Sequence, residues 1–180
     1  MAKKTNELAL IISALEFASK KHKDQRRKDA EASPYINHPI ALAKVLCIEG
    51  EITDHKVICG ALLHDTVEDT ETTEAELIAV FGKSITKIVL EVTDDKSLPK
   101  AERKLKQIEH AGHASKRAKL VKLADKISNL RDILNSPPAN WSLQRKQDYF
   151  DWAKQVVDQV RDASKKLSKT FDEVYARRPL

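Results

Sequence analysis

The spacing of apolar residues along the chain is the feature that most constrains its fold. Apolar side chains recur three or four residues apart over most of the sequence, as Leu8, Ile11 and Leu15 do near its start, and this is the period of an α-helix. The alternation of apolar and polar residues that marks a β-strand is scarce, and only four glycines interrupt the helical pattern. We therefore predict an all-α fold, a helical bundle around one core.

Capping residues and helix breakers set the expected ends of these helices. Ser, Thr and Asp favour helix N-termini, whereas Gly and Pro favour the residues after a helix or its first turn. The first expected helices are 6–22, a helix from Pro39 to Gly50, and a third helix capped by Thr53 and Asp54. A short helix is expected from the Thr73-x-x-Glu76 capping box to Gly82, with a continuation to Val92. The later helices are 100–110, a long helix from Ser115 to Pro137, and two more after it.

The length of 180 residues fits one domain, 1–180, without a linker or an internal repeat. Apolar residues make up 41% of the chain and the net charge is only +5, which argues against intrinsic disorder. No stretch approaches the roughly 20 apolar residues of a membrane span, and the first residues lack the pattern of a secretory signal. Cys47 and Cys59 have apolar neighbours and are expected to be reduced core thiols. We expect a cytoplasmic protein with no membrane contact.

The basic balance of the chain raises nucleic acid as a possible partner. Aromatic residues make up only 5% of the sequence and do not alternate with Lys and Arg, so no stacking platform for single strands is visible. No zinc-finger, RNP or basic-zipper pattern occurs. We expect no nucleic-acid partner, and we interpret the basic residues as solvated surface or, alternatively, as a pocket for a small polyanion. These patterns make no prediction of the oligomeric state.

A cluster of chemically active residues follows the third expected helix. His64, Asp65, Glu68 and Asp69 stand within six positions, at the end of an apolar stretch. A His-Asp pair at a helix end can place an imidazole and a carboxylate on one cation. The alternative is a capped helix end with solvated acids.

Two distant residues extend this cluster. His38 begins a helix with an apolar inner face, where an N-cap or a core histidine is the alternative to a ligand. Asp125 lies beside the apolar stripe of a long helix, and burying an acid costs free energy unless it is paired or coordinated; a surface helix is the alternative there. Together with His64 and Asp65 they supply two imidazoles and two carboxylates, which suit Mn²⁺, Fe²⁺, Co²⁺ or Zn²⁺.

These residues carry a resemblance to a known family. The series His38…His64-Asp65…Asp125 resembles the H…HD…D signature of the HD-domain phosphohydrolases. The flanking segments resemble the hydrolase domain of RelA/SpoT homologues, and in particular its stand-alone branch, the small alarmone hydrolases. The segments that carry this likeness are 35–39, 61–70 and 121–131, and the whole resemblance runs from about residue 8 to 160.

The resemblance implies a single HD-domain helical bundle that hydrolyses the 3′-pyrophosphate of guanosine 3′,5′-bis(diphosphate), ppGpp or pppGpp, to GDP or GTP and pyrophosphate with Mn²⁺. It implies that the metal ligands are His38, His64, Asp65 and Asp125. It also implies that an acidic pair handles the attacking water, namely Glu68 and Asp69. A divalent cation lowers the pKa of bound water, and a nearby carboxylate can take its proton. Long family members add a synthetase domain, which 180 residues do not hold, so we expect no synthetase activity.

The resemblance further implies contacts with the substrate. It places Arg27 and Lys28 next to the nucleotide, where an Arg guanidinium can stack on a purine; an exposed basic loop is the alternative. It places Asn129 near the nucleobase and ribose and Tyr35 beside the pocket. Three residues are expected on the phosphate side, with surface positions as their alternative: Lys100, Arg145 and Tyr149.

Other readings of the same residues remain open. A related phosphohydrolase, for example one that removes the 2′-phosphate of NADPH, would use the same metal centre. A non-enzymatic HD module that binds a nucleotide is a further alternative, although such modules are expected to have lost a ligand. Residues outside the motifs are expected at the surface or at helix caps, or in the packing of the C-terminal helices; they are His22, His55, His110 and His113, and Trp141 and Trp152.

Overall fold

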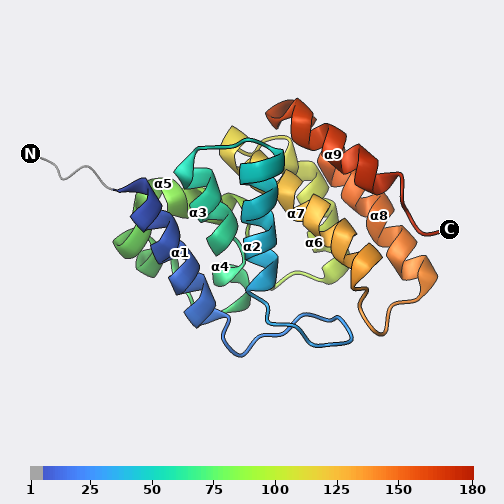
Figure 1. Ribbon diagram of the computed structural model, residues 1–180, viewed down its shortest axis with the longest axis horizontal. Coiled ribbons are helices and arrows are strands. Elements are labelled where there is room, and N and C mark those ends of the chain that lie inside the picture. The colour runs from blue at the N-terminus through green and yellow to red at the C-terminus, as the bar shows by residue number, and fades with distance from the viewer. Residues whose placement is uncertain (1–5) are drawn as a thin grey trace, which may run out of the picture.

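The computed structural model describes residues 6–180, and Figure 1 shows that these residues form a bundle of helices. Within this range there is no β-strand, only an isolated bridge between Arg26 and Pro34, so the predicted all-α fold is confirmed. In chain order the elements are α1 (Glu7–Lys21), α2 (Asn37–Lys44), the π-helical turn η1 (Val45–Glu49), α3 (His55–Leu63), α4 (Thr66–Asp69), α5 (Glu74–Val92), α6 (Lys100–Ala111), α7 (Lys116–Asn135), α8 (Leu143–Asp158), the 3₁₀ turn η2 (Arg161–Ala163) and α9 (Lys165–Tyr175).

The predicted helix caps are confirmed by their hydrogen bonds. The side chains of Asp54, Thr73 and Ser115 accept from backbone N–H groups in the first turns of α3, α5 and α7. The expected helix end at Gly82 and the continuation to Val92 agree with the structure, in which α5 consists of two helical parts that meet at a kink at Gly82. Gly82 has φ +76°, a conformation that glycine adopts without steric cost, so the regular helix is interrupted there.

The core consists of two clusters of buried side chains. One surrounds α7 where it packs against α8, α9 and η1, and it contains Phe150 and Phe171. The other lies where α1 packs on α3 and α5, and it contains Leu63 and Phe81. In Figure 1, α3 lies between these two groups of helices and contributes residues to both clusters. The end of α3, where His64 follows, is therefore fixed from both sides.

One of the two cysteine expectations is wrong. Cys59 on α3 is buried as expected, and burial raises the pKa of its thiol to about 12. Cys47 is exposed. Its neighbours Val45 and Leu46 face the core, so residue 47 falls on the outer side of the η1 turn.

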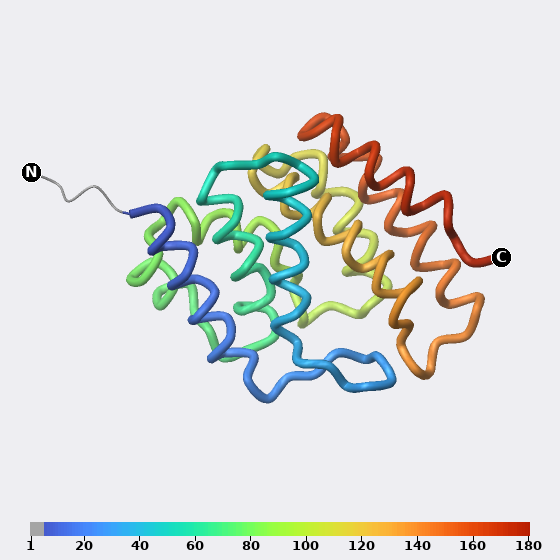
Figure 2. The backbone as a smooth tube through the Cα atoms, in the orientation of Figure 1, coloured from blue at the N-terminus to red at the C-terminus, as the bar shows by residue number. Residues whose placement is uncertain are grey.

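Two loops meet at one edge of the bundle. Figure 2 shows the segment after α1, residues 22–36, and the segment between α7 and α8 approaching each other at the lower edge of the view. The backbone N–H of Ala139 donates to the carbonyl of Lys28 at 3.0 Å, which ties the loops together. None of the helices in residues 6–180 combines the length and apolar character needed to cross a membrane.

We expect Gly60→Ala to destabilise the fold. A Cβ at Gly60 on α3 would lie 2.6 Å from Cγ2 of Ile88, a buried β-branched side chain with little freedom to move. Overpacking of this kind costs about 1–3 kcal/mol of unfolding free energy. Gly112→Ala is the matched control, because its Cβ would meet no atom closer than 3.8 Å. Thermal melts of the two variants test this; a Tm for Gly60→Ala equal to that of the control would contradict it.

Candidate active site

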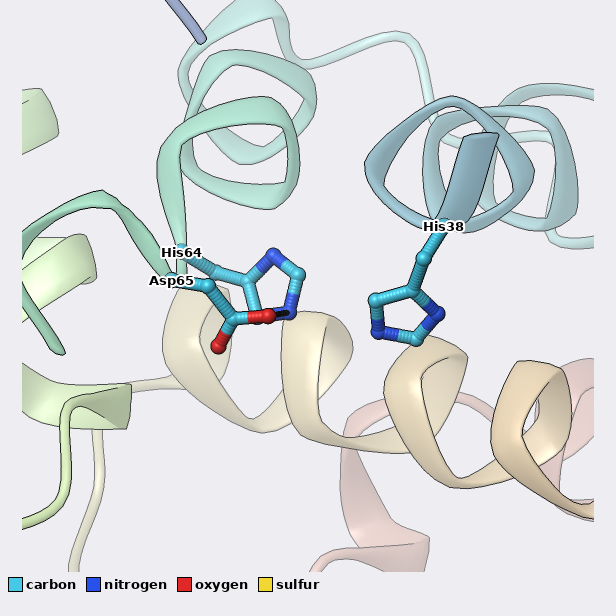
Figure 3. Close-up of side chains that lie close together, drawn as sticks. All are labelled: His38, His64 and Asp65. Atoms are coloured by element: carbon cyan, nitrogen blue, oxygen red, sulfur yellow. Dashed lines mark ion pairs between the residues drawn. The ribbon is translucent and has the colours of Figure 1, made fainter. Parts of the chain in front are cut away.

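Two buried histidines from different helices face each other. His38 stands in the first turn of α2, and His64 directly follows α3. Their ring centroids are 5.3 Å apart, and both residues are buried. Figure 3 shows the two side chains approaching each other, with Asp65 beside His64 and α7 behind them. The ends of two helices therefore present two imidazoles at one point of the interior.

The predicted metal ligands come together at this point. One potential ligand atom from each of His38, His64 and Asp65 lies within 4.8 Å of the others. Asp125 on α7 joins them through its Oδ1, which lies 3.2 Å from Nε2 of His38. These four residues, which we call the ligand cluster, line a cavity of about 330 Å³ that we call the central cavity.

The tautomer of His64 suits a metal ligand. Its Nδ1 lies 2.8 Å from the carbonyl oxygen of Ala61, which can only accept, so Nδ1 carries a proton and Nε2 faces Asp65 at 2.8 Å. A backbone carbonyl that fixes the ring in this way is typical of metal-binding histidines. Burial lowers the pKa of His64, but the charge and hydrogen bond of Asp65 outweigh it and raise the pKa to about 9. A positive charge is therefore favoured between the side chains of His64 and Asp65.

Neighbouring groups keep the two ligand carboxylates ionised. Burial opposes ionisation of Asp125, but the Lys126 ammonium at 2.8 Å and the nearby imidazoles hold its pKa well below the ordinary value. Asn129 donates to the same carboxylate at 2.6 Å. Tyr35 donates its hydroxyl to Asp65, whose pKa is also lowered by His64 against the effect of burial. Asn129 and Tyr35, predicted beside the substrate, therefore also orient carboxylates of the ligand cluster.

Two imidazoles and two ionised carboxylates form a donor set that fits a divalent cation. Nitrogen and oxygen donors of this kind bind first-row transition metals, and the ring orientation of His64 turns Nε2 toward the other members of the ligand cluster. The residues present therefore fit a divalent metal.

The two acids of α4 have different surroundings. Glu68 accepts from the backbone N–H of Asp94 at 3.0 Å, and its ion-pair partner, Arg103, is 3.9 Å away. Burial, with nearby carboxylate charges, raises the pKa of Glu68 to about 7. Asp69 instead accepts from the Lys96 ammonium and from the Gln25 amide. Glu68 is thus the better proton acceptor near neutral pH.

Two larger cavities adjoin the central cavity and share Lys28 and Tyr149 with it. The first, the loop cavity, has a volume of about 530 Å³ and lies between the two meeting loops. Arg27 lines it, donates to Asp132 at 2.5 Å and lies 5.7 Å from the Tyr35 ring. Its guanidinium is therefore held in place at the cavity wall.

The second, the basic cavity, has a volume of about 520 Å³. It brings together three of the predicted basic residues, Lys28, Lys100 and Arg145, and adds Arg103 and Lys104, which were not predicted. Burial and the neighbouring cations lower the pKa values of Lys100 and Lys104. The spacing of residues 100, 103 and 104 places them on one face of α6, a signal that was available in the sequence.

Trp141 and Trp152 pack with the C-terminal helices and His22 caps a helix, as expected, but all three also have surroundings that the motifs did not indicate. Trp152 lines the central and basic cavities, with the ammonium groups of Lys126 and Lys104 at 4.4 Å and 4.8 Å from its ring. Trp141 lines the loop and basic cavities. His22 holds the C-cap position of α1 but is buried, whereas His110 and His113 are exposed as expected. Lys122, a buried lysine of the central cavity, was also missed.

Comparison with known proteins agrees with this geometry. A family model described as HD domain matches residues 14–150. A protein of Danio rerio named guanosine-3′,5′-bis(diphosphate) 3′-pyrophosphohydrolase MESH1 is 54% identical over 170 residues, covering 94% of each chain. The Homo sapiens protein of the same name is 50% identical over 175 residues, covering 97% of this chain and 98% of its own.

A solved structure is similar over the whole fold. It is described as "A metazoan ortholog of SpoT hydrolyzes ppGpp and plays a role in starvation responses", and it matches with a TM-score of 0.92 and 45% identity over 98% of each chain. The chain belongs to the HD-domain family and, within it, to the group that contains these MESH1 proteins. The resemblance predicted from the motifs is confirmed.

We expect Glu68→Gln to stabilise the metal-free protein at neutral and higher pH. The folded-state pKa of Glu68, about 7, lies above its ordinary value of 4.5, so the stability that protonated Glu68 contributes is present below about pH 4.5 and is lost as the pH rises to about 7. The amide of the variant has no proton to lose. The difference in Tm, variant minus wild type, should grow between these pH values and then level off. A constant difference from about pH 4.5 to 8 would contradict the raised pKa.

Proposed function

We propose that this protein is a metal-dependent hydrolase that converts ppGpp or pppGpp to GDP or GTP and pyrophosphate. The observation that carries the proposal is the junction of the central cavity, with its ligand cluster and Glu68, and the basic cavity. Such a junction places a proton acceptor and a set of cations on two sides of a bound polyphosphate. The names of the relatives at 50–54% identity state the same activity.

We infer that the ligand cluster would hold Mn²⁺, because imidazole ligands favour a transition metal over Mg²⁺. Bound there, the cation would polarise a phosphoryl oxygen and lower the pKa of water. Lys126 keeps Asp125 ionised and His64 keeps Asp65 ionised. Asn129 and Tyr35 donate hydrogen bonds to these two carboxylates and orient them.

The chain's own groups would then carry the remaining work. Glu68, with its pKa of about 7, accepts the proton of the attacking water at neutral pH. Lys100, Arg103 and Lys104 balance the phosphate charges. The planar Arg27, fixed by Asp132, offers a surface on which a nucleobase stacks. No side chain acts as a nucleophile in this scheme.

Two further features support our proposals for the cellular compartment and for the chemical class of the partner. The two free cysteines support our proposal that the protein works in the reducing cytoplasm. The basic residues that converge on a cavity support a small polyanion, not a nucleic acid, as the partner.

A second candidate function is removal of the 2′-phosphate of NADPH. The observation that favours it is the pair of large cavities, of about 530 and 520 Å³, that adjoin the central cavity. Two such spaces would accommodate the two halves of a dinucleotide. Product analysis after incubation of the Mn²⁺-loaded protein with ppGpp and, separately, with NADPH decides between the substrates; if neither is hydrolysed, the proposed function is wrong.

Removal of the metal should abolish hydrolysis of ppGpp. We expect Mn²⁺ to restore the activity of chelator-treated protein better than Mg²⁺. Asp125→Ala should lose bound metal, because one of the two carboxylates of the ligand cluster is gone. Metal content by elemental analysis and initial rates test both points. Full activity in metal-free protein would refute the proposal.

Glu68→Gln should retain metal and lose activity. We expect kcat to fall roughly 10²–10⁴-fold, the usual contribution of general acid–base catalysis, since the amide cannot accept the proton. Kinetics on ppGpp and metal content of the same sample test this. Release of metal by this variant would instead make Glu68 a ligand.

Substitution of Arg27 should act on substrate binding. Arg27→Ala is expected chiefly to raise KM, because a contact made equally in the ground and transition states lowers KM without changing kcat. Arg27→Lys should rescue poorly, since an ammonium does not stack as a plane. Steady-state kinetics on ppGpp test both variants; an unchanged KM in both would place the nucleobase elsewhere.

A further inference from the structure

The end of α1 carries a buried histidine that the ligand cluster does not use. His22 is 2% exposed, and its Nε2 is buried without a hydrogen-bond partner among the described residues. Its Nδ1 lies 2.6 Å from Oε1 of Gln25, and its ring packs against Tyr35 with centroids 4.8 Å apart. Because an unpaired polar atom in the interior costs free energy, the position of this ring requires an explanation.

Gln25 connects His22 to the acidic pair. Its Nε2 donates to Oδ2 of Asp69 at 3.0 Å, while the other oxygen of Asp69 accepts from the Lys96 ammonium. An ionised carboxylate only accepts, so the Gln25 amide must present its N–H to Asp69 and its oxygen to His22. Nδ1 of His22 therefore carries a proton. The three residues form a chain of hydrogen bonds with a single possible direction.

The backbone of Gln25 is itself held at both of its polar groups. Its N–H donates to the carbonyl of His22 at 3.0 Å, and its carbonyl accepts from the N–H of Tyr35 at 3.1 Å. The side chain thus starts from a fixed point. Gln25 holds one oxygen of Asp69, whereas the half-exposed Lys96, with its long flexible side chain, holds the other. Without Gln25, no other side-chain hydrogen bond within residues 6–180 opposes a rotation of the Asp69 carboxylate toward Lys96.

We propose that Gln25 is a positioning residue for the hydrolysis, which holds the Asp69 carboxylate beside Glu68, and that His22 acts only through Gln25 by fixing the direction of its amide. This inference rests on the proposed function. A small misplacement of a catalytic group costs up to about 10²-fold in rate, so a shift of the Asp69 carboxylate after loss of Gln25 should be measurable in kcat.

The test compares single and double variants of the Mn²⁺-loaded full chain on ppGpp. Gln25→Ala should lower kcat by about 10- to 100-fold with KM nearly unchanged. His22→Phe keeps a ring against Tyr35 but removes the donor, and it should lower kcat less. The double variant should be no worse than Gln25→Ala, because His22 acts through Gln25. Gln155→Ala, which removes an exposed amide on α8, is the matched control and should behave as wild type.

Bound metal and Tm are measured on every variant to separate a catalytic loss from unfolding. If Gln25→Ala does not fold, Gln25→Met keeps the length of the side chain without its amide and takes its place. An unchanged kcat, a loss confined to KM, or losses that multiply in the double variant would each overturn the proposal.

A measurement independent of activity tests the hydrogen-bond chain. In metal-free protein labelled with ¹⁵N at histidine, the ring nitrogens of His22 should show a proton fixed on Nδ1, and this preference should be lost in Gln25→Ala. A proton fixed on Nε2 in the wild type would contradict the hydrogen-bond chain from His22 through Gln25 to Asp69. Absence of ppGpp hydrolysis by the wild type would overturn the proposed function and the role of Gln25 in catalysis. The spectra would still decide whether the hydrogen-bond chain from His22 to Asp69 exists.

Discussion

The burial of several carboxylates around one cavity is the constraint on which the site depends. Burial raises the pKa of each of them. Asp65 and Asp125 stay ionised because His64 and Lys126 lie against them. Glu68 has no cation in such close contact, and its pKa rises to about 7. One cavity thereby holds two carboxylates of the ligand cluster ionised and leaves a third carboxylate able to exchange a proton near neutral pH.

The parts of the fold that could be predicted are those that depend on residues close together in the sequence. Asp54, Thr73 and Ser115 cap their helices through backbone groups within three residues, so the caps were correct. The break at Gly82 was also predicted, because glycine adopts a backbone conformation with positive φ without steric cost. The packing of both parts of α5 against α3 was not predicted, since no local pattern contains it.

The site likewise has parts that could be predicted from the sequence and parts that could not. The residues of the ligand cluster fall in short motifs, so the sequence alone identified side chains that the fold brings together. Its supporting residues were missed because their partners are distant: Gln25 and Asp69 lie 44 positions apart, and Lys104 and Trp152 meet from different helices. His22 was assigned to a cap or the surface, which its helix-end position suggests. Its burial arises only when the loop after α1 folds back over it.

The sharing of α3 between the two core clusters has a consequence for local stability. Because both clusters hold α3, the end that carries His64 keeps one set of contacts if the other cluster opens, and we expect it to open only when both clusters unfold. The two loops that form the wall of the loop cavity are joined by hydrogen bonds such as that from Ala139 to Lys28, and we expect them to open at a lower free energy. Amide hydrogen exchange should therefore be slow around the central cavity and faster at the loop cavity. The ligand cluster can stay rigid while the loops beside it open.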